Sequence, residues 1–112
     1  MSCVFCDIWR GEARADVAYK WNRAIAISPL NPVTAGHVLI VPGIHVRDFS
    51  SDPETSGYVM KCASEYIDRW HVGQCNIITS VGENATQSVF HLHVHIVPRR
   101  LNDGLKLPWS EQ

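Results

Sequence analysis

Short apolar runs, several of them β-branched and bounded by glycine, proline or polar residues, recur along this chain and predict β-strands. The run at 37–41 is continuously apolar after its first residue and ends at Pro42-Gly43, which predicts a buried central strand. Five runs share this character: 17–20, 24–28, 37–41, 75–79 and 89–98. The pattern predicts a sheet of about five strands, a size typical of small domains.

One long stretch shows helical spacing instead. Ser51-Asp52-Pro53-Glu54 combines a capping residue, an early proline and an early acid, which is typical of a helix start. Apolar residues then recur every three or four positions up to Trp70, and Gly73 follows. This spacing predicts one amphipathic helix of roughly 18 residues. A shorter helix is expected at 5–11.

The histidines of the last predicted strand stand on alternate residues, His91, His93 and His95. Alternate side chains of a strand point to the same face, so the three rings should lie together while Leu92, Val94 and Ile96 enter the core. A row of imidazoles can bind a metal, bind a phosphate, or perform acid–base or nucleophilic chemistry near neutral pH. The residues alone leave these three possibilities open.

The composition is typical of a globular domain and does not favour a nucleic-acid-binding or membrane protein. The 112 residues fit one domain spanning 1–112, with 46% hydrophobic and 19% charged residues. A net charge of −1 gives no support for a nucleic-acid or membrane-surface partner. Because no run could span a bilayer and the amino terminus does not resemble a signal peptide, we expect a cytoplasmic protein. In that reducing compartment, the four cysteines favour metal ligands or buried thiols over disulfides.

The segment 81–99, VGENATQSVFHLHVHIVPR, resembles the histidine triad (HIT) family of nucleotide hydrolases and transferases, whose signature is His-x-His-x-His after a Gly-x-Gln-Ser/Thr loop. The segment 35–42, AGHVLIVP, resembles the family's Pro-Gly-His-apolar-Pro strand, and 3–12 resembles the amino terminus of its bacterial branch. The resemblance implies an α+β, HIT-like fold with a mainly antiparallel sheet, one long helix and a short amino-terminal helix. It also implies a homodimer, which would pair through an edge strand and the helix at 51–70 and so protect exposed sheet edges.

The resemblance further implies a mechanism. His93 would attack the α-phosphorus of a nucleotide and form a covalent nucleotidyl-histidine, which water resolves in a hydrolase and another phosphate resolves in a transferase. His95 and His37 would orient and polarise the phosphate. Ser88, with backbone N–H groups of Gln87 to Val89, would contact phosphate oxygens or the leaving group.

The cysteine pair Cys3-x-x-Cys6 is half of a tetrahedral zinc site, although two such thiols can equally be small buried residues or a redox pair. The resemblance adds His45 and His91 as the other two ligands, which implies one structural Zn²⁺ per chain. Cys62 and Cys75 are expected to be buried apolar residues.

Three departures from the family pattern leave the substrate open. Pro29 stands where many members have an acid that holds the ribose, Ser80 where many have Asn or Gln near the leaving group, and Thr86 where glycine is usual. The nucleoside is expected against an apolar wall. Its residues would be Phe5, Ile8, Trp9, Ile27 and Leu30.

Two other functions remain as alternatives. In one, the histidine row itself holds a catalytic metal in a zinc-dependent hydrolase, although no carboxylate beside the row stands out as a general base. In the other, the protein is a nucleotide-binding module without turnover. The physiological substrate also stays open among purine phosphoramidates, aminoacyl adenylates, dinucleoside polyphosphates and nucleotide sugars.

Overall fold

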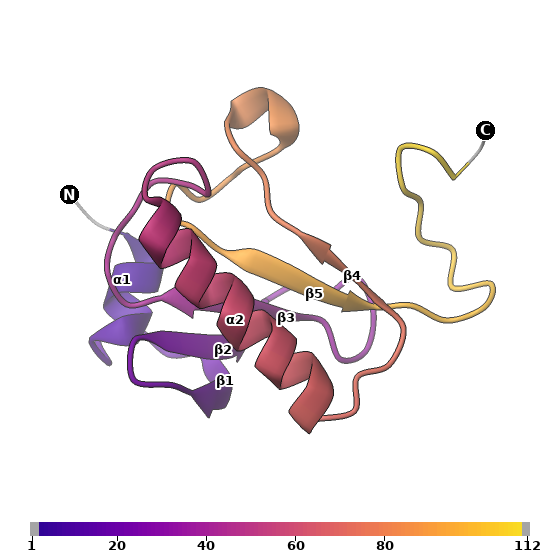
Figure 1. The fold of residues 1–112 in the computed structure, drawn as a ribbon, viewed down its shortest axis with the longest axis horizontal. Helices are drawn as coiled ribbons and strands as arrows, with labels where there is room; N and C mark the ends of the chain where they lie inside the picture. Colours follow the sequence, from indigo (N-terminus) through magenta and orange to yellow (C-terminus); the bar gives the residue numbers. More distant parts are fainter. Residues whose placement is uncertain (1–2, 111–112) are drawn as a thin grey trace.

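The computed structural model describes residues 3–110, which form a sheet with a helix on each face (Figure 1). The elements follow in the order α1 (Val4–Trp9), β1 (Asp16–Lys20), β2 (Ala24–Ser28), β3 (Val38–Pro42), α2 (Pro53–Arg69), β4 (Cys75–Ile78), the 3₁₀ turn η1 (Glu83–Ala85) and β5 (Val94–Pro98). Neither helix of the described chain is long and apolar enough to cross a membrane.

The five strands lie in the order β1-β2-β3-β5-β4, and each neighbouring pair is antiparallel. The α+β prediction with a mainly antiparallel sheet and one long helix is therefore confirmed. β5 enters between β3 and β4, so the last strand in sequence is an interior strand of the sheet. Its carboxyl end consequently lies in mid-sheet, and the chain leaves it as a long tail (Figure 1).

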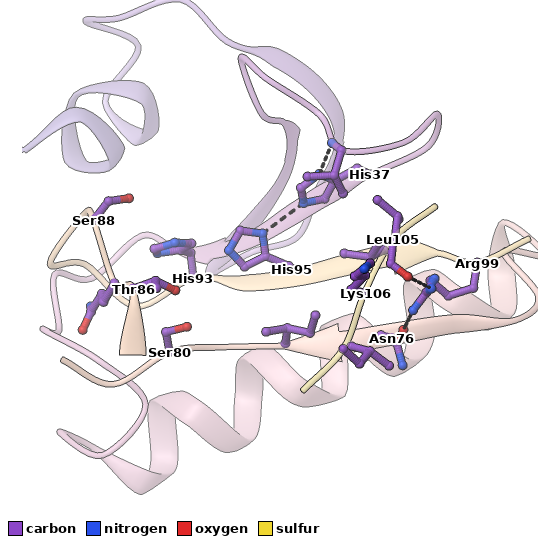
Figure 2. Close-up of a pocket in the computed structure, with 15 residues that line it drawn as sticks. His37, Asn76, Ser80, Thr86, Ser88, His93, His95, Arg99, Leu105 and Lys106 are labelled. Atoms are coloured by element: carbon purple, nitrogen blue, oxygen red, sulfur yellow. Dashed lines mark hydrogen bonds between the residues drawn. The ribbon is translucent and has the colours of Figure 1, made fainter. Parts of the chain in front are cut away.

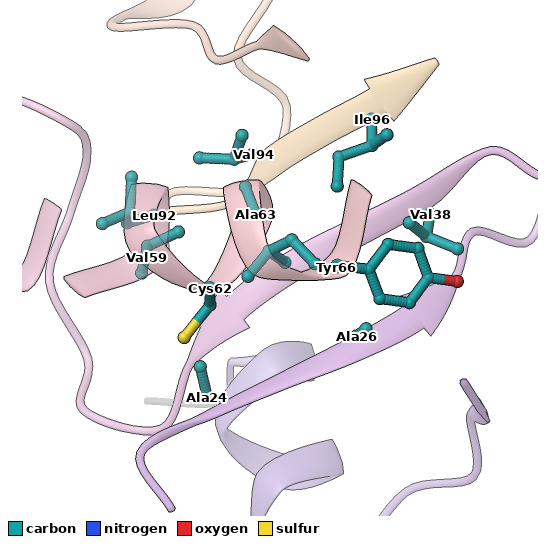
Figure 3. Close-up of a cluster of buried hydrophobic side chains, with 11 residues drawn as sticks. Ala24, Ala26, Val38, Val59, Cys62, Ala63, Tyr66, Leu92, Val94 and Ile96 are labelled. Carbon is teal, nitrogen blue, oxygen red and sulfur yellow. The ribbon is translucent and has the colours of Figure 1, made fainter. Parts of the chain in front are cut away.

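The long helix α2 packs across one face of the sheet. Val59, Cys62, Ala63 and Tyr66 follow the i, i+3, i+4, i+7 spacing of one helix face, and all four are buried. They meet side chains from the middle of the sheet, among them the small Ala24 and Ala26 of β2 (Figure 3). The helix predicted from 51–70 is thus confirmed.

The opposite face carries a second apolar cluster under α1. Phe5 of α1 packs there with Ile25, Ile27, Leu39 and Val41, while the intervening residues of β2 and β3 enter the α2 side. Because both faces of these strands are covered, their sequences are continuously apolar. Gly43, just after β3, lies so close to the Trp9 ring that a Cβ there would clash with it.

The strand predicted at 89–98 is shorter than expected. Only Val94–Pro98 pairs with its neighbours, so His95 lies in β5 while His91 and His93 lie in the segment before it. The ladder to β3 begins at the pair Ile40–Val94, and the N–H of Leu92 donates to Val46 O instead. Pro42 has no N–H with which to extend the ladder. Leu92, Val94 and Ile96 nevertheless all enter the core beneath α2, as the alternation predicts.

Two smaller expectations also differ from the structure. The amino-terminal helix runs from Val4 to Trp9 and not over 5–11, and it ends before the left-handed Gly11. Cys62 is buried as predicted, whereas Cys75 is only half-buried because it lies on the edge strand β4.

Candidate active site and metal centre

The three alternate histidines divide between two neighbouring sites. His91 turns toward Cys3 and Cys6, whereas His93 and His95 line a cavity together with His37. Phe5 stands at the junction, with ring centroids 5.7 Å from His91 and 5.1 Å from His93.

The first site contains four ligand atoms close to one another: Cys3 Sγ, Cys6 Sγ, His45 Nδ1 and His91 Nδ1 all lie within 4.8 Å. His91 Nδ1 is 3.4 Å from Cys3 Sγ and 3.5 Å from Cys6 Sγ, and His45 Nδ1 is 3.3 Å from Cys6 Sγ. Zn–S bonds of about 2.3 Å and Zn–N bonds of about 2.0 Å require ligand separations of roughly 3.3–3.8 Å in a tetrahedron. The donor set and its spacing therefore fit a zinc ion.

The local structure around Cys3, Cys6 and His91 positions their ligand atoms. Cys3 is the N-cap of α1 and Cys6 lies three residues on, so one turn brings both thiols to the same side of the helix. The fully buried His91 donates its Nε2 hydrogen to the carbonyl oxygen of Pro42 at 2.9 Å, which leaves Nδ1 of the neutral ring free for a metal. Burial also lowers the pKa of His91 and favours that neutral form.

The second site contains His93 in a fixed orientation. Its Nδ1 hydrogen is donated to the carbonyl oxygen of His91 at 2.8 Å, so Nε2 of the neutral ring carries a lone pair. The hydroxyl of Thr79 donates to the carbonyl oxygen of His93 at 2.8 Å and fixes the backbone as well. The sequence predicts His93 as a nucleophile, and such a histidine needs an acceptor for its Nδ1 hydrogen. The carbonyl oxygen of His91 is that acceptor.

His37 and His95 form a hydrogen-bonded chain beside it. The N–H of Val33 donates to His37 Nδ1 at 3.1 Å, and His37 Nε2 lies 3.0 Å from His95 Nδ1. Burial lowers the pKa of both rings, to about 4 for His95, where the charges of His93 and His37 add to the effect. Both rings are thus neutral near pH 7. His37 Nε2–H must then donate to His95 Nδ1, so His95 holds its own hydrogen on Nε2.

These histidines line a cavity of about 350 Å³ (Figure 2). Ser80, Thr86, Gln87 and Ser88 form part of its lining, as the sequence led us to expect for Ser80, Gln87 and Ser88. Among the described residues that line the cavity there is no carboxylate, whereas Arg99 and Lys106 are cations. The cavity is therefore suited to an anionic group beside a nucleophilic imidazole.

The loop before the histidines departs from expectation at Gln87. Its backbone N–H donates to Gly82 O at 3.1 Å and so is engaged within the loop, not available to a phosphate. Its side chain receives the N–H of Gly82 and donates to the carbonyls of Arg47 and Val89, which holds the loop in shape. The backbone of Thr86 has a φ of 70°, the left-handed region that glycine favours, which accounts physically for the glycine usual at this position. Val89 packs against the apolar cluster under α1 and is not among the residues lining the cavity.

The expected apolar wall lies outside the cavity lining. Phe5 and Ile27 are buried in the cluster under α1, and Ile8 and Trp9 pack against that cluster. Leu30 is 99% exposed on the connection after β2. The contact between Phe5 and His93 joins this wall to the site, and a nucleoside at the wall stays a prediction.

The lining also includes residues that the sequence did not predict, among them the polar side chains of Asn76, Arg99 and Lys106. The tail after β5 folds back so that Leu105, Lys106 and Leu107 reach the cavity. The sequence contains one signal that the tail is ordered, the pair Arg99 and Asp103, which are four residues apart. Opposite charges at such spacing in a loop-like tail can fix its conformation.

Comparison with known proteins agrees with this geometry. The HIT domain family matches residues 10–102. The crystal structure of a zinc-bound histidine triad family protein from Mycobacterium smegmatis is 35% identical with a TM-score of 0.83, covering 100% of this chain and 85% of that one. A HIT family hydrolase from Clostridium thermocellum is 31% identical with a TM-score of 0.81, covering 95% of this chain and 96% of that one. An adenylylsulfatase of Arabidopsis thaliana is 32% identical over 98% of this chain and 57% of its own length.

Proposed function

This chain belongs to the HIT domain family, and from that premise we propose that it hydrolyses nucleotide conjugates at the α-phosphate through a covalent bond to His93. The observation that carries the proposal is the 2.8 Å hydrogen bond from His93 Nδ1 to the carbonyl of His91. This hydrogen bond fixes the His93 ring and leaves its Nε2 unprotonated, and His93 is one of the residues that line the cavity. The relatives that are named a hydrolase and an adenylylsulfatase support the same class of reaction.

In the proposed first step, the Nε2 lone pair of His93 attacks the α-phosphorus. A P–N bond to His93 forms, the bond from phosphorus to the leaving group breaks, and the leaving group departs with that electron pair. An amine leaving group also takes up a proton from solvent as it departs. The positive charge that develops on the imidazole is stabilised by the carbonyl oxygen of His91, which still accepts the Nδ1 hydrogen. Water then attacks the same phosphorus, breaks the P–N bond, and releases the nucleoside monophosphate and a proton.

The His37–His95 chain supplies a hydrogen-bond donor to this reaction. With His95 Nδ1 occupied by His37, the hydrogen on His95 Nε2 can bind a phosphate oxygen as negative charge develops there. The ring centroids of His93 and His95 are 5.2 Å apart, so both can contact one phosphate.

The direct test is capture of the intermediate. The protein is mixed with a purine phosphoramidate, an aminoacyl adenylate, a dinucleoside polyphosphate and a nucleotide sugar in turn, and intact mass is recorded within the first turnover. We expect an increase equal to one bound nucleoside monophosphate with at least one of these substrates, located on His93 by peptide mapping. Turnover in single-turnover conditions with no such increase would contradict the covalent mechanism.

We also propose a structural Zn²⁺, one per chain, at Cys3, Cys6, His45 and His91. The spacing of the four ligand atoms and the zinc-bound relative support it. A bound zinc would fix His91, and the carbonyl of His91 orients His93. The metal would thereby stabilise the segment that carries the nucleophile while all four of its positions are filled by protein.

The two alternatives make different predictions. A zinc ion held by the histidine row would require converging ring nitrogens, but His91 Nδ1 turns to the cysteines and His93 Nδ1 is bound to a carbonyl. Hydrolysis that persists in chelator would exclude a catalytic metal. A binding module would show tight nucleotide binding without turnover on any of the four substrates.

Replacing the supporting histidines should slow the reaction without abolishing it. We expect His95→Ala to lower kcat by roughly 10²–10³-fold, the usual effect of losing one donor to a developing oxyanion. His37→Ala should cost less, roughly tenfold, because His37 acts through His95. Steady-state kinetics on one substrate measure both, with the exposed His71→Ala as the control. A complete loss of adduct in His95→Ala would contradict the assignment of His93 as the only nucleophile.

We further propose that the protein is a homodimer. The edge strand β4 leaves Ile77 45% exposed, and an exposed apolar residue on an unpaired edge favours association. Sedimentation at micromolar concentration should give twice the chain mass of 12.6 kDa. Ile77→Lys should shift the protein toward the monomer, with Arg14→Glu, an exposed residue outside β4 and α2, as a control for changed charge. A monomeric wild-type protein would contradict this proposal.

A further inference from the structure

The cavity opens where the strands β4 and β5 separate. The ladder between them ends at the pair Ile78–His95. Two residues further on, the same register would pair Ser80 with His93, but the chain has left the ladder there and both residues line the cavity. Figure 2 shows the two side chains together at the end of the cavity away from Arg99. His93 therefore lies on a stretch of backbone that the ladder to β4 does not hold.

One side chain connects the two strands at the point where they separate. Thr79, the residue after β4, donates its hydroxyl hydrogen to the carbonyl oxygen of His93 at 2.8 Å. A side-chain hydrogen bond thus takes the place of the backbone ladder at the residue that carries the reacting imidazole. The bond is partly buried, which strengthens it relative to a hydrogen bond in open water.

Two other contacts of this segment lie on the amino-terminal side of His93. His91 Nε2 donates to the carbonyl oxygen of Pro42 at the end of β3, and the ring of His93 donates to the carbonyl oxygen of His91. The hydroxyl of Thr79 instead holds the peptide group that follows His93, and it does so from the β4 side. The backbone around His93 is consequently held from both neighbouring strands.

We propose that Thr79 is a positioning residue for the reaction, because its hydroxyl fixes the backbone of His93 so that Nε2 approaches the α-phosphorus in line with the bond that breaks. This inference rests on the proposed function. Attack on phosphorus tolerates little error in position, since a displacement of ~1 Å can cost a factor of about 10² in rate. Thr79 is not among the described residues that line the cavity, so it acts through His93 and not on the substrate.

The test replaces Thr79 with valine, which keeps the β-branched shape and removes the donor. We expect Thr79→Val to lower the single-turnover rate of adduct formation roughly tenfold, measured first with adenosine 5′-phosphoramidate and then with the other three substrate classes. KM and the affinity for adenosine monophosphate should stay within about twofold of wild type, because the groups that line the cavity are unchanged. Thr79→Ser keeps the donor and should restore most of the rate.

Thr55→Val is the matched control. The buried hydroxyl of Thr55 donates to Asp52 at 2.6 Å, at the start of α2 and outside the cavity lining. Its loss should lower the melting temperature, as the loss of any partly buried hydroxyl hydrogen bond does, but leave the rate of adduct formation unchanged.

Four results would overturn this inference while wild-type adduct formation still supports the covalent mechanism. These are a wild-type rate in Thr79→Val, a loss that appears in KM and not in the rate constant, a loss that Thr79→Ser does not recover, and an equal loss of rate in Thr55→Val. A wild-type protein that forms no adduct with any of the four substrates would overturn the proposed function itself, and this inference with it.

Discussion

His93→Ala should reduce turnover by at least ~10⁴-fold and abolish the nucleotidyl adduct. The reason is that His93 supplies the atom that bonds to phosphorus, and an alanine leaves no group at that position that could form the bond. Nucleotide affinity should persist, because His95, Ser88 and the cationic tail still line the cavity. Stopped-time assays, intact mass and calorimetric titration of the nucleoside monophosphate measure the three quantities on one preparation.

The matched control is His71→Ala, which removes an exposed histidine beyond the end of α2 and should change none of these quantities. His93→Gly with added imidazole provides a second control, since the free base can enter the vacated space and restore part of the turnover. Near-wild-type turnover in His93→Ala would refute the covalent mechanism.

Cys6→Ser should remove zinc and lower the free energy of unfolding by roughly 3 kcal/mol or more. Cys6 Sγ lies within 3.3–3.5 Å of both His45 Nδ1 and His91 Nδ1, so its loss removes one of the four ligand atoms of the cluster. Some activity should remain, because the zinc would act only by fixing the segment before β5. Elemental analysis gives the zinc content, and denaturant unfolding gives the stability.

The control is Cys75→Ser, which changes a half-buried thiol on the edge strand outside the four-ligand cluster. It should keep full zinc content and cost little stability. Full zinc occupancy in Cys6→Ser would show that the ligand assignment is wrong. Complete loss of hydrolysis in zinc-free but folded protein would instead favour a catalytic metal.

The sequence determined the elements of this fold and the kinds of residue at its site. Strand and helix periods depend on neighbours within one element, so β2, α2 and the burial of alternate residues around His93 could be predicted locally. The antiparallel pairing of the strands, the proposed zinc ligands and the proposed role of His93 came from resemblance to the HIT family, because no local pattern joins Cys3 to His91, 88 residues away.

Only the tertiary structure places His91 in the four-ligand cluster and His93 and His95 in the cavity, and only it shows that the tail lines the cavity. His91 differs from His93 because α1 brings two thiols next to the His91 ring. The carbonyl of Pro42 binds His91 Nε2, and the β3–β5 ladder stops at the pair Ile40–Val94, short of both histidines. The engaged N–H of Gln87 and the exposed Leu30 likewise depend on where loops lie. The tail reaches the cavity because β5 is an interior strand, so its carboxyl end lies beside Asn76 of β4, within reach of Arg99. Such contacts join residues distant in sequence, and their energies are set by packing and charge in three dimensions, which a periodic pattern does not record.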